Sequence, residues 1–151
     1  MYHGRILNNK INKLHERPLR LVYKTDELTF QELLDKDNTF NVHNRNIQKL
    51  AVEMYKVKNG LSPNFIQTLF QPMYSSYNLR SDSDFTLYNI RTVHYGSETI
   101  SYMGPKIWNK IPHDIKSSSN LNEFRMKIKS WSPEGCECRI CKTYVYRLGF
   151  I

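Results

Sequence analysis

The chain has 151 residues, which bounds it to one domain or one domain with tails. Hydrophobic residues make up 40% of it and aromatic residues 13%, so its composition excludes an intrinsically disordered chain, although the mean hydropathy is -0.60. No apolar run approaches the roughly 20 residues of a membrane span. We expect no signal peptide, because the N-terminal residues are too polar for one. We therefore expect an intracellular chain, located in the cytoplasm, the nucleus or both.

The formal net charge is +8 and the isoelectric point is about 9.4, which predicts attraction to polyanions and to nucleic acid first. Residues 1–24 hold six Lys or Arg against one acid, and residues 104–151 hold nine against four. The intervening residues 25–103 hold seven against nine. The basic charge therefore gathers towards both ends of the sequence. The alternative interpretation is an ordinary basic protein.

The first predicted helix covers residues 5–24. Apolar residues recur on it at helical spacing, and we expect this side to pack: Leu7, Ile11, Leu14, Leu21 and Val22. Cations recur on the neighbouring side: Lys10, Lys13, Arg17, Arg20 and Lys24. Successive cations on one helix face can neutralise successive phosphates, so this row predicts contact with nucleic acid. A solvated face is the alternative. Pro18 predicts a kink or a restart of the helix.

Several shorter elements follow in the sequence. Thr29–Glu32 has the capping-box pattern, which predicts the start of a short helix. An apolar stripe over residues 47–57 predicts the clearest helix of the chain, and Gly60 supplies its C-terminal stop. A short helix is expected over residues 63–70. Residues 71–87 are rich in Ser, Asp, Asn and Tyr, which is typical of a loop.

A small antiparallel hairpin is expected next. Residues 90–95 and 97–103 are short β-prone runs on either side of Gly96. The Gly104–Pro105 pair is expected to break the second strand and to open a helix that carries Trp108. We expect Trp108 to be a core residue, and stacking on a nucleic-acid base is the alternative.

A second basic helix follows a linker at residues 117–120. Its apolar face consists of Leu121, Phe124, Ile128 and Trp131. Three cations lie elsewhere around it, and we expect them to contribute to nucleic-acid binding: Arg125, Lys127 and Lys129.

The tail contains all three cysteines of the chain, Cys136, Cys138 and Cys141. Their close spacing suits a reducing compartment and not a disulfide framework. A closed structural zinc site needs four ligands, so a zinc ion here would take its fourth ligand through the fold, from His113 or His94. Three free thiols are the alternative.

Sequence motifs of catalysis are absent. The six glycines are far apart, so there is no phosphate-binding loop, and neither an H-E-x-x-H motif nor a nucleophile elbow occurs. Asp82 and Asp84 stand two residues apart in a Ser-rich segment. They could be ligands of a metal ion, and the alternative is that they belong to a solvated loop. We expect no catalytic residues in this chain.

Several motifs carry a family resemblance when they are taken in order along the chain. They are LNNKIN at 7–12, HERPLR at 15–20, YKVKNGLSP at 55–63, YNLR at 77–80, GPKIW at 104–108 and CECRICK at 136–142. Together they resemble the C-terminal end of reverse transcriptases of non-LTR retrotransposons (LINE-like, jockey-type). The resemblance implies a thumb-like helical segment after the palm of an RNA-directed DNA polymerase, in contact with the RNA template and the growing DNA. It also implies that the catalytic aspartates lie upstream. Pro18 departs from the family's pattern, and so does the three-cysteine tail.

The sequence thus predicts a mainly α fold with a short antiparallel β-hairpin. We expect a thumb-like helical domain over residues 1–131, with the hairpin near 90–103, and an irregular cysteine-containing tail over residues 132–151. The predicted function is binding to RNA and DNA through backbone contacts, without a membrane partner. The alternative is an inert retroelement remnant with a packing role, in which Arg17 and Arg20 pair with carboxylates of the palm.

Overall fold

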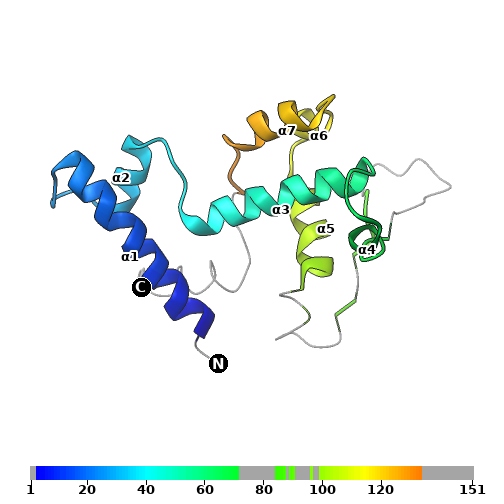
Figure 1. The fold of residues 1–151 in the computed structure, drawn as a ribbon, viewed down its shortest axis with the longest axis horizontal. Coiled ribbons are helices and arrows are strands. Elements are labelled where there is room, and N and C mark those ends of the chain that lie inside the picture. The colour runs from blue at the N-terminus through cyan, green and yellow to red at the C-terminus, as the bar shows by residue number, and fades with distance from the viewer. Residues whose placement is uncertain (1–2, 72–83, 88, 91–95, 97–98, 134–151) are drawn as a thin grey trace, which may run out of the picture. The chain divides into compact units, whose positions relative to one another are not determined.

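The computed structural model describes residues 3–71, 84–87, 89–90, 96 and 99–133, with side chains from residue 10 onward. Within these ranges the chain forms seven α-helices and no β-strand, which confirms the mainly α prediction (Figure 1). None of these helices combines the length and the apolar character that crossing a membrane requires. The chain divides into two compact units, one containing Met1–Asn46 and the other Ile47–Pro133.

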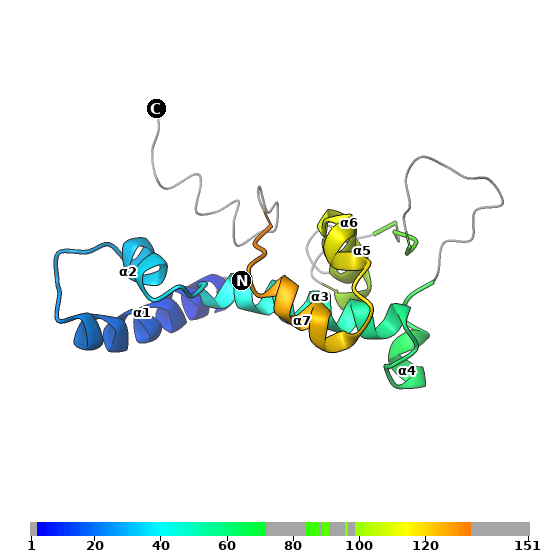
Figure 2. The same ribbon diagram turned by 90° about the horizontal axis from the view of Figure 1, so that it is seen from above.

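The first unit is built on two helices, α1 (His3–Tyr23) and α2 (Phe30–Lys36), which lie next to each other in both views (Figures 1 and 2). Leu19 of α1 is buried against Leu33 and Leu34 of α2. Outside this small core, the hydroxyl of Tyr23 donates a 3.0 Å hydrogen bond to a carboxylate oxygen of Asp37. Apolar burial and one hydrogen bond therefore stabilise the packing of α1 and α2.

The predicted capping box of α2 is confirmed. The backbone N–H of Glu32 donates to the Thr29 hydroxyl over 3.3 Å, and the Thr29 N–H donates to the Glu32 carboxylate over 2.6 Å. The helix ends at the cap residue Asp37, and Asn38 follows with a left-handed φ of 51°. Asn tolerates this conformation better than most residues do, which explains why the polar turn stops the helix here.

The helix α1 runs unbroken through Pro18, so the predicted restart does not occur, whereas the kink stays a prediction. Pro18 lies on the exposed side, where water can reach the carbonyl that proline leaves without a donor. The predicted packing side of α1 is wrong. Leu14, Leu21 and Val22 are 61%, 79% and 70% exposed, although they were expected to pack. The opposite side of α1 is the buried one, because Leu19 there meets the two leucines of α2.

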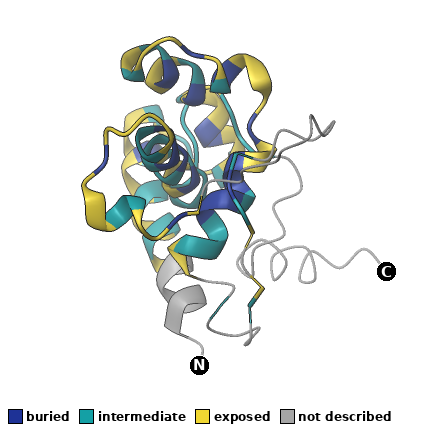
Figure 3. Cartoon of the chain, turned by 90° about the vertical axis from the view of Figure 1, so that its right-hand side faces the viewer, coloured by how far each residue is buried: buried dark blue, intermediate teal, exposed yellow. Residues whose placement is uncertain are grey.

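Four helices follow in the second unit after α3 (Val42–Lys58), within which the boundary between the units falls. They are α4 (Asn64–Gln67), α5 (Ile100–Lys110), α6 (His113–Lys116) and α7 (Leu121–Ile128). Buried and exposed residues lie on different sides of these helices (Figure 3). The apolar stripe of α3 and its stop at Gly60, which has a φ of 68°, are confirmed.

Aromatic rings form the centre of the second unit. Trp108 and Phe124 are completely buried, and their ring centroids lie 6.0 Å apart at an interplanar angle of 24°. Tyr55 also stacks on Phe124, with ring centroids 4.4 Å apart, and its hydroxyl donates a 2.8 Å hydrogen bond to the carbonyl of Ser118. The prediction that Trp108 is a core residue is therefore confirmed, and base stacking by its ring is excluded in this fold.

The second strand of the predicted hairpin is wrong, because residues 100–103 form the first turn of α5. The greater part of the first predicted strand, residues 91–95, lies outside the described residues. Gly104 and Pro105 are buried inside α5 instead of starting it. A Cβ atom on Gly104 would lie 2.6 Å from Sδ of Met54, so the glycine lets α5 approach α3 closely. This tertiary contact favours helix where the local sequence favours strand.

Candidate nucleic-acid interface

The cations of α1 are the strongest candidates for a binding surface. Four of them are exposed, and within the described part of the chain their side chains make no ion pair or hydrogen bond: Lys10, Lys13, Arg17 and Lys24. Lys10, Lys13 and Arg17 stand at steps of three and four residues, which is one side of a helix. Lys24 directly follows the last residue of α1 and has a left-handed φ of 47°, so it lies beyond the helix. Three of the five predicted members therefore form a row on α1.

Arg20 is the fifth predicted member, and it differs from the others. Its Nε and Nη2 atoms lie 2.9 Å and 2.6 Å from Oε1 of Glu16, one helical turn earlier. Its Nη1 atom also donates a 3.5 Å hydrogen bond to the carbonyl of Thr25. Only 27% of the Arg20 side chain is exposed. Arg20 therefore holds the end of α1 and is not free to bind a phosphate.

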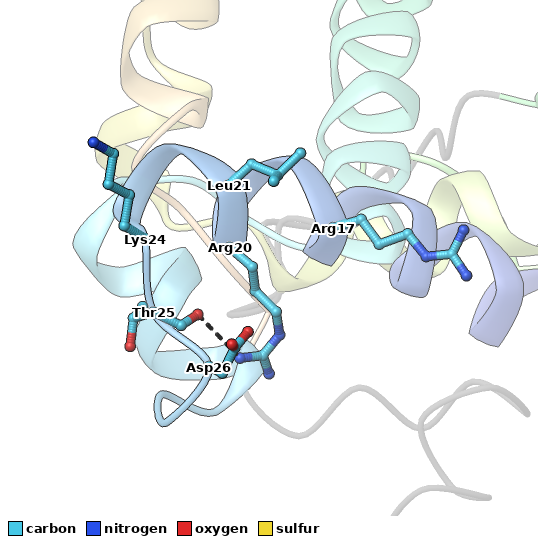
Figure 4. A pocket seen from close by; sticks show the side chains of 6 residues that line it. All are labelled: Arg17, Arg20, Leu21, Lys24, Thr25 and Asp26. Carbon is cyan, nitrogen blue, oxygen red and sulfur yellow. Dashed lines mark hydrogen bonds between the residues drawn. The ribbon is translucent and has the colours of Figure 1, made fainter.

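A hollow of about 470 Å³ lies at this end of α1, lined by Arg17, Arg20, Leu21, Lys24, Thr25 and Asp26. Figure 4 shows that the side chains of Arg17 and Lys24 point away from each other, while Arg20 reaches towards Thr25. The carboxylate of Asp26 would also repel an anion. The geometry suits contacts along an extended polyanion better than enclosure of a single phosphate.

The cations of α7 divide in the same way. Nζ of Lys127 lies 2.8 Å from Glu123 and donates a 3.2 Å hydrogen bond to the carbonyl of Asp114. Hydrogen bonds from Lys127, and then from Ser119, lower the pKa of Glu123 to about 2. Arg125 and Lys129, by contrast, are exposed, and their side chains have no partner among the residues that the structure describes. Because α7 and α1 belong to different units, these two cations form a separate set.

An unpredicted polar cluster surrounds Trp108. One carboxylate oxygen of Asp84 accepts a 2.6 Å hydrogen bond from the indole nitrogen, and the other lies 2.8 Å from Nζ of Lys58. Burial alone would raise the pKa of Asp84, but hydrogen bonds from Lys58 and Trp108 outweigh it and lower the pKa. Lys58 and Lys116 lie 5.7 Å and 5.6 Å from the centre of the indole ring. No local pattern signals this cluster, because its members are far apart in the sequence.

The candidate metal ligands are largely outside the described residues. Cys136, Cys138 and Cys141 lie there, as do His94 and Asp82, so the predicted zinc site stays a prediction. His113 is described and exposed, at the start of α6. No group of three or more metal-binding side chains occurs in the described ranges.

No model of a known protein family matches the chain, and neither a curated protein nor a solved structure is detectably similar to it. Function is therefore inferred from the exposed side chains and from the sequence motifs.

Proposed function

We propose that this chain binds nucleic acid as a thumb-like region of the reverse transcriptase of a non-LTR retrotransposon. The observation that carries the proposal is a set of four exposed cations that lack partners among the described residues: Lys10, Lys13 and Arg17 on α1, and Lys24 directly after its last residue. The family part of the proposal rests on the sequence motifs alone.

The dimensions of the row suit a nucleic-acid backbone. Lys10 and Arg17 are seven residues apart on α1, which corresponds to about 10 Å along an α-helix at 1.5 Å per residue. Duplex DNA carries about one negative charge per 1.7 Å of its axis, so a row of this length can meet several phosphates. Such contacts position a protein on the backbone and carry no sequence information. We therefore propose that RNA and DNA both bind.

Arg20 and Lys127 have a different role in this proposal. Each forms an ion pair within its own helix, with Glu16 and Glu123 respectively. Breaking such a pair to reach a phosphate gives little net gain, because one ion pair replaces another. Arg125 and Lys129 of α7 are the better candidates for additional backbone contacts.

Catalysis is not part of the proposal. The resemblance implies that the catalytic aspartates of the parent polymerase belong to its palm, and this chain would act beside that domain. Incorporation of nucleotides by the purified chain, on a primed template with Mg²⁺, would contradict this.

A packing role is the second candidate, and the exposed Leu14, Leu21 and Val22 favour it. Large apolar side chains that gather on a surface often mark a contact with another protein. In this case α1 would pack on the palm, and the isolated chain would have negligible affinity for nucleic acid.

Anisotropy titrations of a labelled RNA and a primer–template duplex with the Arg17→Glu variant test the proposal. Reversing one phosphate-contacting charge should weaken binding by about tenfold or more, because a hydrogen bond to a charged group contributes about 1.5 kcal/mol or more. Lys49→Glu is the matched control, because Lys49 is an exposed cation outside α1. Equal losses in both variants would mean that only net charge matters. No binding by the folded wild-type chain would favour the packing role.

A further inference from the structure

The exposed side of α1 has a seven-residue repeat that a phosphate-binding role does not require. Leu14 and Leu21 are seven residues apart and are 61% and 79% exposed. Lys10 and Arg17 are also seven residues apart, and Arg17 stands three residues after Leu14. The two leucines and the two cations therefore run as parallel strips along the same helix.

The pattern matches one side of a heptad repeat. Seven residues make about two turns, so residues at this spacing stay on one side of a helix. If the leucines take position d, Lys10 and Arg17 take position g, which flanks the contact between paired helices and pairs with charges of the partner. The opposite flank, position e, holds His15 and Val22, which provide no fixed charge. The apolar strip is thus bordered by cations on one flank only.

We propose that this face of α1 is a docking surface for an acidic amphipathic helix of a second protein. The partner helix would place apolar side chains on Leu14 and Leu21, as in helix-in-groove recognition. Its Asp or Glu residues on one flank would lie against Lys10 and Arg17. The apolar contacts would supply affinity, and the one-sided charge would set orientation and exclude partners of the wrong sign.

A second copy of this chain fits the face poorly. Glu16 is the only acidic residue of α1, and it is paired with Arg20 on another side of the helix. An antiparallel pair of α1 helices would bring position g against position g, and so place cations against cations. A parallel pair would leave the cations beside His15 and Val22, without an acidic partner.

An anionic membrane also fits less well. Helices that lie on membranes carry a large apolar face, usually with aromatic residues, bordered by basic residues. The exposed strip here consists of Leu14, Pro18, Leu21 and Val22, without an aromatic residue, and the cations border one flank. Charge complementarity therefore favours an acidic helix over a lipid surface.

The inference shares Lys10 and Arg17 with the proposed nucleic-acid interface but does not depend on it. If both ligands bind, they exclude each other, since each needs Arg17 and its neighbours. The leucines separate the two ligands, because a backbone-binding row makes no use of them.

The test uses the full chain and a synthetic helical peptide of about three heptads, with Leu at positions a and d and Glu at positions e and g. We expect saturable binding in an anisotropy titration. The double variant Leu14→Ser and Leu21→Ser should lose about tenfold or more in peptide affinity, and should change RNA affinity less than about twofold. Arg17→Glu should weaken the binding of both the peptide and the RNA. Leu61→Ser, at a leucine 58% exposed in the other unit, is the matched control and should change neither.

Four results would overturn the inference. They are the absence of saturable peptide binding, equal binding of the same peptide with Lys in place of Glu, wild-type affinity in the leucine double variant, and binding to phosphatidylserine vesicles in preference to the peptide. Circular dichroism of each variant shows whether it is folded. Peptide binding without RNA binding would contradict the proposed function and support this inference. RNA binding without peptide binding would contradict this inference and support the proposed function.

Discussion

The indole nitrogen of Trp108 donates a 2.6 Å hydrogen bond to a carboxylate oxygen of Asp84, twenty-four residues earlier in the chain. The neighbouring Phe85 is buried and packs its ring edge-on against the indole, with centroids 6.0 Å apart. Phe85 also meets Phe70 at 6.0 Å. One polar and two aromatic contacts therefore fasten residues 84–85 to the core of the second unit.

Substitution of Trp108 should separate the ring's contribution from that of its hydrogen bond. Trp108→Ala empties a fully buried site and should lower the free energy of unfolding by about 3–5 kcal/mol. Trp108→Phe keeps an aromatic ring but removes the donor, and should cost about 1–3 kcal/mol. Urea unfolding measures both, with the exposed Asn109→Ala as control. Equal losses in the two variants would show that the hydrogen bond to Asp84 dominates over packing.

Glu123 should make the second unit sensitive to acid. Its pKa is lowered from an ordinary value of 4.5 to about 2 by hydrogen bonds from Lys127 and Ser119. Because the folded pKa is the lower one, this stabilisation is complete above about pH 4.5 and is lost as the pH falls towards 2. NMR titration of the Glu123 carboxyl carbon measures the folded pKa directly. In the Glu123→Gln variant, the free energy of unfolding should depend less on pH between about pH 4.5 and 2 than it does in the wild type. An unshifted pKa would contradict the hydrogen bonds described here.

The contact between α5 and α3 at Gly104 should be intolerant of a methyl group. In Gly104→Ala the new Cβ would lie 2.6 Å from Sδ of Met54 and 3.0 Å from Cε1 of Phe70. Overpacking of this kind should cost about 1–3 kcal/mol in urea unfolding. Met54→Ala removes the obstructing sulfur, so the double variant should be more stable than the sum of the single losses predicts. Strict additivity would mean that the helices do not meet at this point.

The capping box of α2 should be worth about 1 kcal/mol. Thr29→Ala removes the acceptor for the Glu32 N–H and should lower the stability of the first unit by about 0.5–2 kcal/mol. Thermal unfolding followed by circular dichroism measures this loss. Glu27→Ala, at an exposed position just before the helix, is the control. A loss of stability no larger than in that control would mean that the capping box does not stabilise the first unit.

Local signals in the sequence predicted the elements that local interactions determine. Thr29 and Glu32 bond to each other's backbone three residues apart, so their pattern is readable without the fold. The stripe of α3 and the left-handed Gly60 at its end are of the same kind. The cations of α1 were also readable, because charged residues on one side of a helix stay exposed unless a partner covers them.

Features that depend on distant residues were not predicted. The β-prone residues 100–103 are helical, and Gly104 of the same helix packs against Met54, fifty residues earlier. The sequence of α1 has apolar residues on two sides, and only the position of α2 decides that Leu19 is buried while Leu14 is exposed. The same applies within the candidate interface, since only the structure distinguishes Arg20, paired with Glu16, from its exposed neighbours.

The most direct test of the account is the salt dependence of nucleic-acid binding by the full chain. Three exposed cations on α1, with Lys24 directly after it, predict a slope of about -3 to -4 when the logarithm of the association constant for duplex is plotted against the logarithm of salt concentration. Arg17→Ala should reduce the magnitude of this slope by about 1, and Lys49→Ala should leave it unchanged. An affinity that does not change between low and moderate salt would contradict the claim that α1 grips backbone phosphates.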